Sequence, residues 1–303
     1  MKRFDAVGFG GLNVDKLFKV NKIAGAEEES CITGYKEACG GSAANTVVGL
    51  SRLGCKVGFI GKIADDREGR MLIEDFRREG VDTNGIIHSK SGRSGSVMGF
   101  VDNEGGRALY VDPGVNDTLD FNEINLKYAF QTCFLHITSF VGEKSFQTQQ
   151  RLVESLPENV KLSFDPGEFY ARKDIALEPI VKRTFILMPN QKELELLTKT
   201  LRYSEGAKAL LKKGVKIVAV KLGDRGCYVT DGKENYHIEP FKVKVVDTTG
   251  AGDAFCAGFL FGLIKGKSLY ECGRLGNFVA SRCIMKMGAR SGLPYLKDLK
   301  SLG

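Results

Sequence analysis

The chain has 303 residues, of which 43% are hydrophobic and 27% are charged, and it carries a formal net charge of +7. No apolar run approaches the ~20 residues that cross a bilayer, and no signal-peptide pattern follows the first residues, so we expect a cytoplasmic protein without membrane contact. Lysine and arginine are spread along the chain rather than clustered, which argues against nucleic-acid binding and fits a general attraction for phosphate ligands.

The N-terminal third of the chain contains several short extended patterns. Residues 4–10 have the apolar pattern of a first strand that ends in a glycine turn. Two extended pieces are predicted between residues 17 and 39. A hairpin is predicted at 96–102 and 107–111, joined by the turn at 103–106.

Two adjacent glycines introduce the first predicted helix. Gly40 and Gly41 precede a helical stretch that places Val47 and Val48 on one face. Gly54 follows this stretch and is the expected stop, because glycine adopts the backbone conformation that ends many helices.

Strand and helix patterns then alternate along the rest of the chain. Strands are predicted near residues 56–62, 133–137, 160–164, 184–188, 217–221, 227–230 and 234–238. Helices are predicted near residues 67–79, 143–154, 175–182, 191–198, 205–213, 251–263 and 268–285. Such alternation predicts an α/β fold with a mostly parallel sheet that helices cover on both faces. Ligands of such sheets bind beyond the carboxyl ends of the strands.

Two of these strand ends carry polar residues of interest. Asn190 and Glu193 have the spacing of a capping box, in which Asn190 caps the helix that follows. Lys221 ends the next strand and is followed by Gly223 and Gly226, which predict a tight loop before an edge hairpin.

Residues 246–259 combine a strand end, a glycine turn and an apolar helix. The β-branched run at 243–246 predicts the end of a buried strand. Gly250 and Gly252 leave backbone N–H groups open at the start of a helix, where they predict a cradle for a phosphoryl group. Asp253 is either a first-turn acid that stabilises the helix or a general base that takes a proton from a substrate hydroxyl.

Two motifs carry a resemblance to a known family. Residues 247–253, which read Asp-Thr-Thr-Gly-Ala-Gly-Asp, resemble the C-terminal signature of the PfkB carbohydrate kinases, also called ribokinase-like kinases. Residues 40–45 resemble the N-terminal signature. The resemblance implies a single ribokinase-like domain over residues 1–303, doubly wound around a mostly parallel sheet with helices on both faces. It also implies a small β-sheet lid formed by about residues 15–39 and 96–112.

The resemblance implies an ATP-dependent kinase that phosphorylates a hydroxyl of a small sugar. Asp253 would be the general base, and the N–H groups of Gly250, Ala251 and Gly252 would stabilise the charge of the transferring group. The residues implied to bind the sugar are Asn13, Asp15, Gly40, Gly41, Ser42 and Asn45, together with Met98 and Phe100 on a lid strand. The residues implied to bind ATP are Asn190, Lys221, Gly223, Gly226 and Asn277.

Metal sites are implied in the same way. Glu193 resembles the family's magnesium element and would act through water, since Mg²⁺ prefers oxygen ligands and keeps most of its waters. Asp247 and Thr249 resemble a site at which some members bind potassium. Ser42 and Lys221 are among the positions that depart from the family pattern. Ser42 replaces the lysine of bacterial ribokinases, which weakens the case for ribose, and Lys221 replaces a threonine, so that it offers a charge to phosphate.

Other functions stay open at this stage. A nucleoside kinase of the adenosine, guanosine, inosine or cytidine type is the main alternative, because the ribose of a nucleoside presents the same pair of hydroxyls. A non-catalytic sensor of sugars or nucleotides fits less well with an intact Asp253. Lid strands of this family often pair between subunits, so a homodimer through the lid is also expected.

Overall fold

The computed structural model describes residues 2–104, 106–172 and 174–302. Within these residues, nine strands form one large sheet in the order β13-β12-β11-β10-β9-β8-β1-β4-β5. The strands are β1 (Phe4–Phe9), β4 (Val57–Ala64), β5 (Asp82–Ser89), β8 (Thr132–Ile137), β9 (Lys161–Phe164), β10 (Thr184–Leu187), β11 (Ile217–Lys221), β12 (Cys227–Thr230) and β13 (Asn235–Ile238). Neighbours from β11 to β5 pair in parallel, whereas β12 pairs antiparallel with both β11 and β13.

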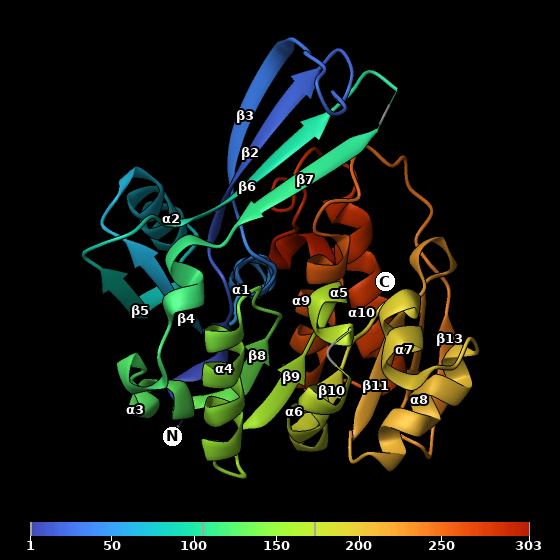
Figure 1. Ribbon diagram of the computed structural model, residues 1–303. Coiled ribbons are helices and arrows are strands. Elements are labelled where there is room, and N and C mark those ends of the chain that lie inside the picture. The colour runs from blue at the N-terminus through green and yellow to red at the C-terminus, as the bar shows by residue number, and fades with distance from the viewer. Residues whose placement is uncertain (1, 105, 173, 303) are drawn as a thin grey trace.

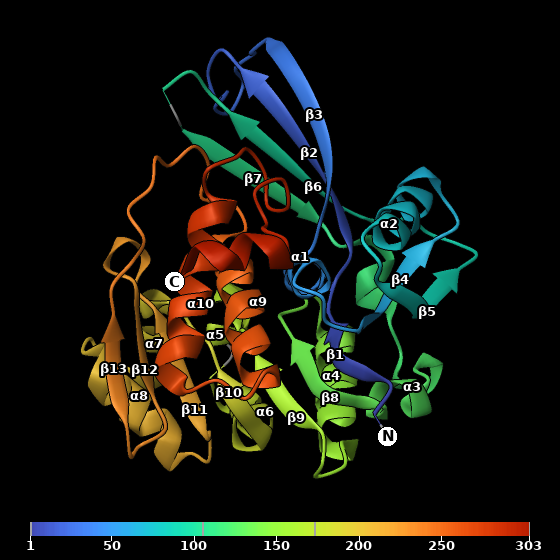
Figure 2. The same ribbon diagram turned by 180° about the vertical axis from the view of Figure 1, so that it is seen from behind.

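Helices cover both faces of this sheet (Figures 1 and 2). One face packs against α1 (Ser42–Arg52), α2 (Arg67–Arg78), α9 (Ala251–Ile264) and α10 (Leu269–Cys283). The other packs against α3 (Leu126–Phe130), α4 (Glu143–Ser155), α5 (Gly167–Ala171), α6 (Glu178–Arg183), α7 (Gln191–Thr198) and α8 (Tyr203–Lys212). Adjacent strand residues point to opposite faces, so Phe59 of β4 joins the first core and Ile60 joins the second. The predicted doubly wound α/β fold is therefore confirmed.

A second sheet of four strands stands apart from the large one (Figure 1). Its order is β3 (Ile32–Gly40), β2 (Asn13–Val20), β6 (Gly95–Val101) and β7 (Arg107–Asp112). Because β2 follows the carboxyl end of β1 after three residues, the small sheet rises from the edge of the large sheet where ligands of α/β proteins bind. Its strands lie where the sequence predicts the lid.

The structure corrects the prediction for residues 243–246, which form no strand. These residues belong to the irregular connection between β13 and α9, and the backbone N–H of Val246 donates to the oxygen of Ile284 at 2.8 Å. Val245 and Val246 are about half exposed. Sequence analysis also missed β5, whose first residues are polar because this strand forms one edge of the sheet.

No helix among the described residues combines the length and the apolar character that crossing a membrane requires.

Candidate active site

Helix α9 begins at the glycine turn that the sequence predicts. Gly250 has a φ angle of 76°, and a Cβ atom there would lie 2.6 Å from the Cβ of Ala289, so a larger residue does not fit. The helix that follows is buried from Ala254 to Gly262 and packs between α1 and α10. This packing fixes the helix N-terminus, where N–H groups lack intrahelical acceptors and a partial positive charge attracts anions.

Asp253, in the first turn of α9, is held from α1. Nδ2 of Asn45 donates to Oδ2 of Asp253 at 2.8 Å, and Oγ1 of Thr46 donates to its backbone oxygen at 3.2 Å. Burial raises the pKa of Asp253 to about 6, although the hydrogen bond from Asn45 opposes this rise. A carboxyl group with this pKa is largely ionised at neutral pH and still accepts a proton readily, as a general base must.

Two cavities meet at Asp253. The first, of about 480 Å³, lies between the small sheet and the start of α9, and the second, of about 680 Å³, lies beside α10 and the ends of β9 and β11. The residues that line both cavities are Ser42, Thr248, Ala251, Gly252 and Asp253. Molecules bound in the two cavities would therefore face each other across the first turn of α9.

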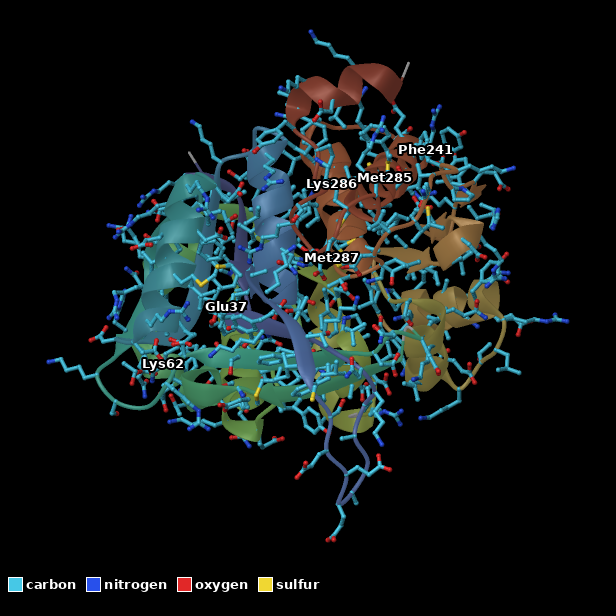
Figure 3. The ribbon with its side chains drawn as sticks, turned by 90° about the horizontal axis from the view of Figure 1, so that it is seen from above. Glu37, Lys62, Phe241, Met285, Lys286 and Met287 are labelled. Carbon is cyan, nitrogen blue, oxygen red and sulfur yellow. The ribbon has the colours of Figure 1, made fainter. Side chains whose placement is uncertain are left out.

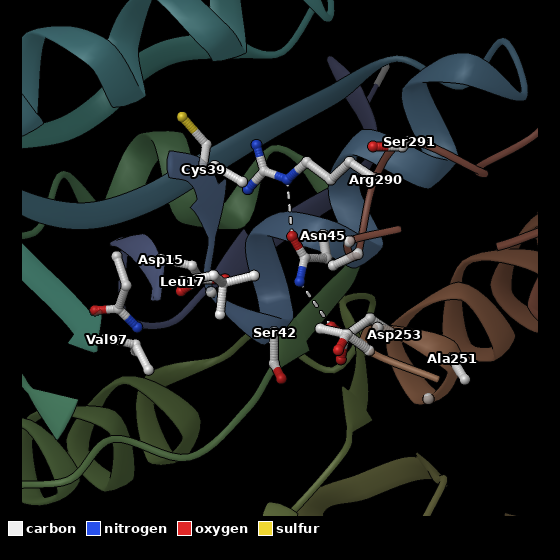
Figure 4. A pocket seen from close by; sticks show the side chains of 18 of the residues that line it. Asp15, Leu17, Cys39, Ser42, Asn45, Val97, Ala251, Asp253, Arg290 and Ser291 are labelled. Atoms are coloured by element: carbon white, nitrogen blue, oxygen red, sulfur yellow. Dashed lines mark hydrogen bonds between the residues drawn. The ribbon is translucent and has the colours of Figure 1, made fainter. Parts of the chain in front are cut away.

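The first cavity contains most of the residues predicted to bind the sugar (Figure 4). Its lining includes Asn13, Asp15, Gly41, Ser42 and Asn45. Gly40 is not part of the lining, but a Cβ atom there would overlap the carboxylate of Asp15. The glycine therefore provides the room that Asp15 occupies.

The small sheet turns one of its faces toward this cavity. Leu17 and Val97, with Leu109 and Val111 from β7, form an apolar wall, and Lys36 of β3 adds an ammonium group. The cavity thus combines carboxylates and amides with an apolar surface, and Lys36 adds a cation from the small sheet.

Met98 and Phe100, which were predicted to bind the sugar, are not part of the lining of the first cavity. Phe100 stacks on Phe18 with ring centroids 5.2 Å apart, on the face of the small sheet opposite to Val97. Neighbouring residues of a strand point to opposite faces, so Val97 lines the cavity and Met98 lies outside it.

The second cavity contains the residues predicted to bind ATP and magnesium. Its lining includes Asn190, Glu193, Lys221, Gly223, Gly226 and Asn277. The capping box is also present, because the N–H of Glu193 donates to Oδ1 of Asn190 at 2.9 Å and the N–H of Asn190 donates to Oε2 of Glu193 at 2.8 Å. Burial, followed by the charge of Asp165, raises the pKa of Glu193 to about 7.

Asp165 is a site residue that sequence analysis missed. It directly follows β9, and its Oδ2 lies 2.6 Å from Nζ of Lys221 in a pair with side chains only 9% and 13% exposed. Its other oxygen, Oδ1, is buried without a hydrogen-bond partner among the described residues. Burial alone would lower the pKa of Lys221, but the Asp165 carboxylate more than offsets this and keeps the amine charged. The position of Asp165 at the carboxyl end of a parallel strand was the signal in the sequence.

Lys221 also lies close to the start of α9. A Cβ atom on Gly252 would stand 3.3 Å from Nζ of Lys221, so the ammonium group borders the glycine turn. Glycine at this position leaves the space between the cation and the helix N-terminus open.

An apolar region of the second cavity lies beside α10. Phe241, Val243 and Val245 contribute to it, together with Ile284, and Phe241, labelled in Figure 3, packs edge-on against Phe278 with ring centroids 5.5 Å apart. The misassigned run at 243–246 is thus apolar because part of it lines a cavity.

Asn277 lines this cavity while supporting its wall. Its Nδ2 donates to the backbone oxygens of Ile238 and Glu239, each at 3.0 Å. These bonds fix the chain as it leaves β13, so the donor side of the amide already has partners.

Asp247 connects two loops near the first cavity. Its Oδ1 accepts from the N–H and Oγ1 of Thr249 at 2.9 and 2.7 Å, and its Oδ2 accepts from the N–H of Gly288 at 2.7 Å. In the part of the chain that the structure describes, no group of three or more His, Cys, Asp or Glu side chains is arranged to hold a metal ion.

Comparisons with known proteins agree with this geometry. The chain matches the family model for pfkB family carbohydrate kinases over residues 5–296. It is 49% identical to an uncharacterized sugar kinase of Archaeoglobus fulgidus over an alignment of 255 residues that covers 83% of this chain and 100% of that protein. It is 30% identical to a 5-dehydro-2-deoxygluconokinase of Clostridium botulinum, with 98% of this chain and 92% of that protein aligned. The crystal structure of a ribokinase from Thermotoga maritima superposes with a TM-score of 0.88 at 29% identity, covering 98% of each chain.

The doubly wound α/β fold, the two cavities that meet at a helix N-terminus and the family match together define a phosphotransferase. The chain belongs to the pfkB family of carbohydrate kinases, and its fold is that of ribokinase. It is therefore an ATP-dependent kinase with a sugar hydroxyl as the acceptor.

Proposed function

We propose that Asp253 is the general base of this kinase, and that the sugar occupies the first cavity while ATP occupies the second. The observation that carries the proposal is the shared lining of the two cavities at Gly252 and Asp253. Both volumes, about 480 and 680 Å³, fall within the range of small-molecule sites.

The reaction follows from the order of groups across the first turn of α9. Asp253 takes the proton of the sugar hydroxyl as its oxygen attacks the γ-phosphorus, and the bond from that phosphorus to the leaving ADP oxygen breaks. The N–H groups of Gly250, Ala251 and Gly252 stabilise the negative charge of the transferring group. The ammonium of Lys221, beside Gly252, adds a fixed positive charge.

Magnesium fits the same cavity. Glu193 and the unpartnered Oδ1 of Asp165 supply carboxylate oxygens near the proposed phosphate position, and Asn190 offers an amide. Mg²⁺ usually binds through one or two carboxylates, several waters and substrate phosphates, and it would neutralise charge on the ATP phosphates. Potassium near Asp247 and Thr249 stays a prediction that assays with and without K⁺ would test.

The acceptor is proposed to be a free sugar or sugar acid. Asn13 and Asp15 supply the amide and carboxylate that suit neighbouring hydroxyls, and Lys36 would pair with the carboxylate of a sugar acid. The 5-dehydro-2-deoxygluconokinase relatives make their sugar acid a reasonable member of the test panel.

A nucleoside is the second candidate. The apolar wall of Leu17, Val97, Leu109 and Val111 would cover a base whose ribose lies near Asp15. Turnover with nucleosides but not with free sugars would favour this candidate.

We also propose that two chains pair through the small sheet. Its edge strands β3 and β7 have one unpaired edge each among the described strands, and large side chains such as Tyr35, Leu109 and Tyr110 are about half exposed there. Unpaired strand edges are pairing surfaces, so this sheet supports a homodimer.

ADP release from magnesium-ATP tests the proposed chemistry. The wild type and Asp253→Asn are compared against ribose, fructose, other hexoses, 5-dehydro-2-deoxygluconate and a set of nucleosides. The substitution is expected to lower kcat by at least ~10²-fold while the KM for ATP stays near that of the wild type. Near-normal turnover by the variant would remove Asp253 as the base. ATP binding without turnover across the panel would point to an acceptor outside the panel.

A further inference from the structure

A chain of hydrogen bonds leads from Asp253 to the far side of helix α1. Nδ2 of Asn45 donates to Oδ2 of Asp253 at 2.8 Å, and Nε of Arg290 donates to Oδ1 of Asn45 at 2.7 Å (Figure 4). Arg290 is in turn paired through Nη1 with the carboxylate of Asp75 on α2. These hydrogen bonds therefore connect α2, the loop after α10, α1 and α9.

The chemistry of the two neighbours fixes how the Asn45 amide is turned. A guanidinium group has N–H donors and no acceptor, so Arg290 must face the oxygen of the Asn45 amide. An ionised carboxylate accepts hydrogen bonds and donates none, so Asp253 must face the nitrogen. With Arg290 in place, Asn45 can present only its N–H group to the Asp253 carboxylate.

Arg290 is itself held from several directions. It is 9% exposed, and besides its contacts with Asp75 and Asn45 its Nη2 donates to the oxygen of Gly40 at 3.2 Å. The backbone oxygen of Arg290 accepts from Nη1 of Arg52 at 2.7 Å. A buried guanidinium with this set of partners has little freedom to reorient.

We infer that Arg290 is a positioning residue for the catalytic base: paired with Asp75, it orients Asn45, which holds the Asp253 carboxylate toward the two cavities. The inference rests on the proposed role of Asp253. It assigns Asn45 a task toward the base in addition to the sugar contact that the family resemblance implies. Arg290 acts through Asn45: among the described residues its guanidinium hydrogen-bonds to Asn45, Asp75 and Gly40, and not to Asp253.

This arrangement predicts a specific pH effect. The charged group facing Asp253 from the end of β9 is Asp165, and the one from β11 is Lys221, while the titratable thiols nearby belong to Cys256 of α9 and Cys283 of α10. Asn45 favours the ionised carboxylate, because it donates to it. Loss of this donor makes Asp253 easier to protonate. The acid limb of the pH profile, where kcat/KM falls as the pH is lowered, therefore moves to higher pH.

The test variant is Arg290→Met combined with Asp75→Asn, which avoids leaving a buried carboxylate without its cation. Methionine offers no donor to Asn45, so the amide is free to turn. We expect kcat per folded molecule to fall by at least ~10-fold, and the acid limb to rise by about one pH unit. The KM for ATP is expected to stay near that of the wild type.

The chain offers a matched control in Arg52→Met combined with Glu79→Gln. Arg52 and Glu79 form a similar pair, 12% exposed on each side, and Arg52 holds the same loop through the backbone oxygens of Arg290 and Leu293. Within the described part of the chain, neither side chain of this pair hydrogen-bonds to Asn45. The control is expected to lower the melting temperature while its acid limb stays where the wild type has it.

A second variant covers the case in which the double substitution fails to fold. Asn45→Asp is nearly isosteric, and one of its carboxylate oxygens can still accept from Arg290. The other would then face Asp253, and repulsion between the two carboxylates should shift the acid limb upward as well.

Four outcomes would overturn the inference or the function on which it rests. An acid limb and kcat equal to the wild type in the Arg290 and Asn45 variants would overturn the inference, as would the same shift in the Arg52 control. If Asp253→Asn retains turnover, the proposed function itself fails. If Asp253→Asn is inactive while the Arg290 variant behaves like the wild type, only the positioning role fails.

Discussion

At the scale of single residues, Lys221 and Asp165 form a pair whose presence stability alone does not explain. Their side chains are 13% and 9% exposed, with 2.6 Å between the charged atoms. Removal of one partner from a buried ion pair typically destabilises a protein by about 3–5 kcal/mol, but replacement of both by apolar residues is often neutral. The proposed contact between Lys221 and the ATP phosphates would explain why this buried ion pair is present.

Lys221→Met alone is expected to lower the free energy of unfolding by about 3–5 kcal/mol, and to lower kcat by at least ~10²-fold. Lys221→Met with Asp165→Leu should recover most of that stability without recovering kcat. Denaturant unfolding and steady-state kinetics measure the two effects. Asp165→Asn, which keeps the cation, is the control for loss of the carboxylate. If the double variant recovers both its stability and its kcat, the proposed contact between Lys221 and the ATP phosphates is wrong.

The raised pKa of Asp253 has a consequence for stability. Its pKa is raised from 3.8 to about 6, chiefly by burial, so the folded protein favours the protonated carboxyl group. The free energy of unfolding is therefore highest below pH 3.8, and it falls as the pH rises through 6 and the carboxyl group ionises. Asp253→Asn removes this dependence. At pH 8 the variant is expected to be more stable than the wild type by on the order of 2 kcal/mol, with no difference below pH 4.

Thermal melts of the ligand-free protein between pH 4 and pH 8 measure this difference. Asp231→Asn, at the turn between β12 and β13, is a control of opposite sign. Hydrogen bonds from the N–H groups of Glu234 and Lys233 lower the pKa of Asp231, so its loss should destabilise the protein above pH 4. Equal melting temperatures of Asp253→Asn and wild type at pH 8 would contradict the prediction that the ionised Asp253 carboxylate destabilises the folded protein.

At the scale of elements, segments with a local signal at both ends were predicted with the bounds that the structure has. Helix α7 starts at the capping box of Asn190 and Glu193, and β11 ends at Lys221 before a glycine turn. Residues 243–246 were misassigned because β-branched residues suit both a strand and an apolar cavity wall.

The site was predictable where it resides in a contiguous motif. Residues around Gly250 and Asp253 are adjacent in the chain, so their spacing carried the information. Asp165 meets Lys221 across 56 positions, and Arg290 meets Asn45 across 245 positions, so only the folded sheet brings each pair together.

The small sheet offers a test of the acceptor's charge. Lys36 of β3 lines the first cavity, and a Cβ atom on Gly288 would lie 4.0 Å from its Nζ, so its ammonium reaches toward the loop opposite. Lys36→Gln is expected to raise the KM for an acidic sugar by about 10-fold, the effect of losing one partly exposed charge contact of ~1.4 kcal/mol. The kcat should stay near that of the wild type.

The control for this prediction is Lys19→Gln, on the neighbouring strand β2, because Lys19 is exposed and is not part of the cavity lining. Initial rates at increasing sugar concentration compare the two variants. If the KM of the Lys36 variant is unchanged for every acidic sugar that the wild type accepts, Lys36 does not contribute to acceptor binding.

At the scale of the whole molecule, one face of the small sheet lines the first cavity, and the other pairs with α2 through Lys16 and Glu37. The other face carries an aromatic cluster in which Phe18 lies 5.0 Å from Tyr35 and 5.2 Å from Phe100, and Phe100 lies 6.0 Å from Tyr110, between ring centroids. Tyr110 is 58% exposed. A second copy of the chain that pairs along β3 or β7 would also cover Tyr35 or Tyr110 of this cluster, and apolar burial stabilises association.

Tyr110→Lys is therefore expected to convert a dimer into a monomer, because a charge on this face would have to be desolvated in the pair. Light scattering at several protein concentrations measures the molar mass. Tyr270→Lys is the matched control, since Tyr270 is 44% exposed on α10, which is not part of the small sheet. The monomeric variant should also show a higher KM for the sugar, because Asp15, Leu17 and Lys36 reach the first cavity from the sheet that pairing would hold in place. A wild type that is monomeric at assay concentrations, or a Tyr110 variant that remains dimeric, would exclude assembly through this face.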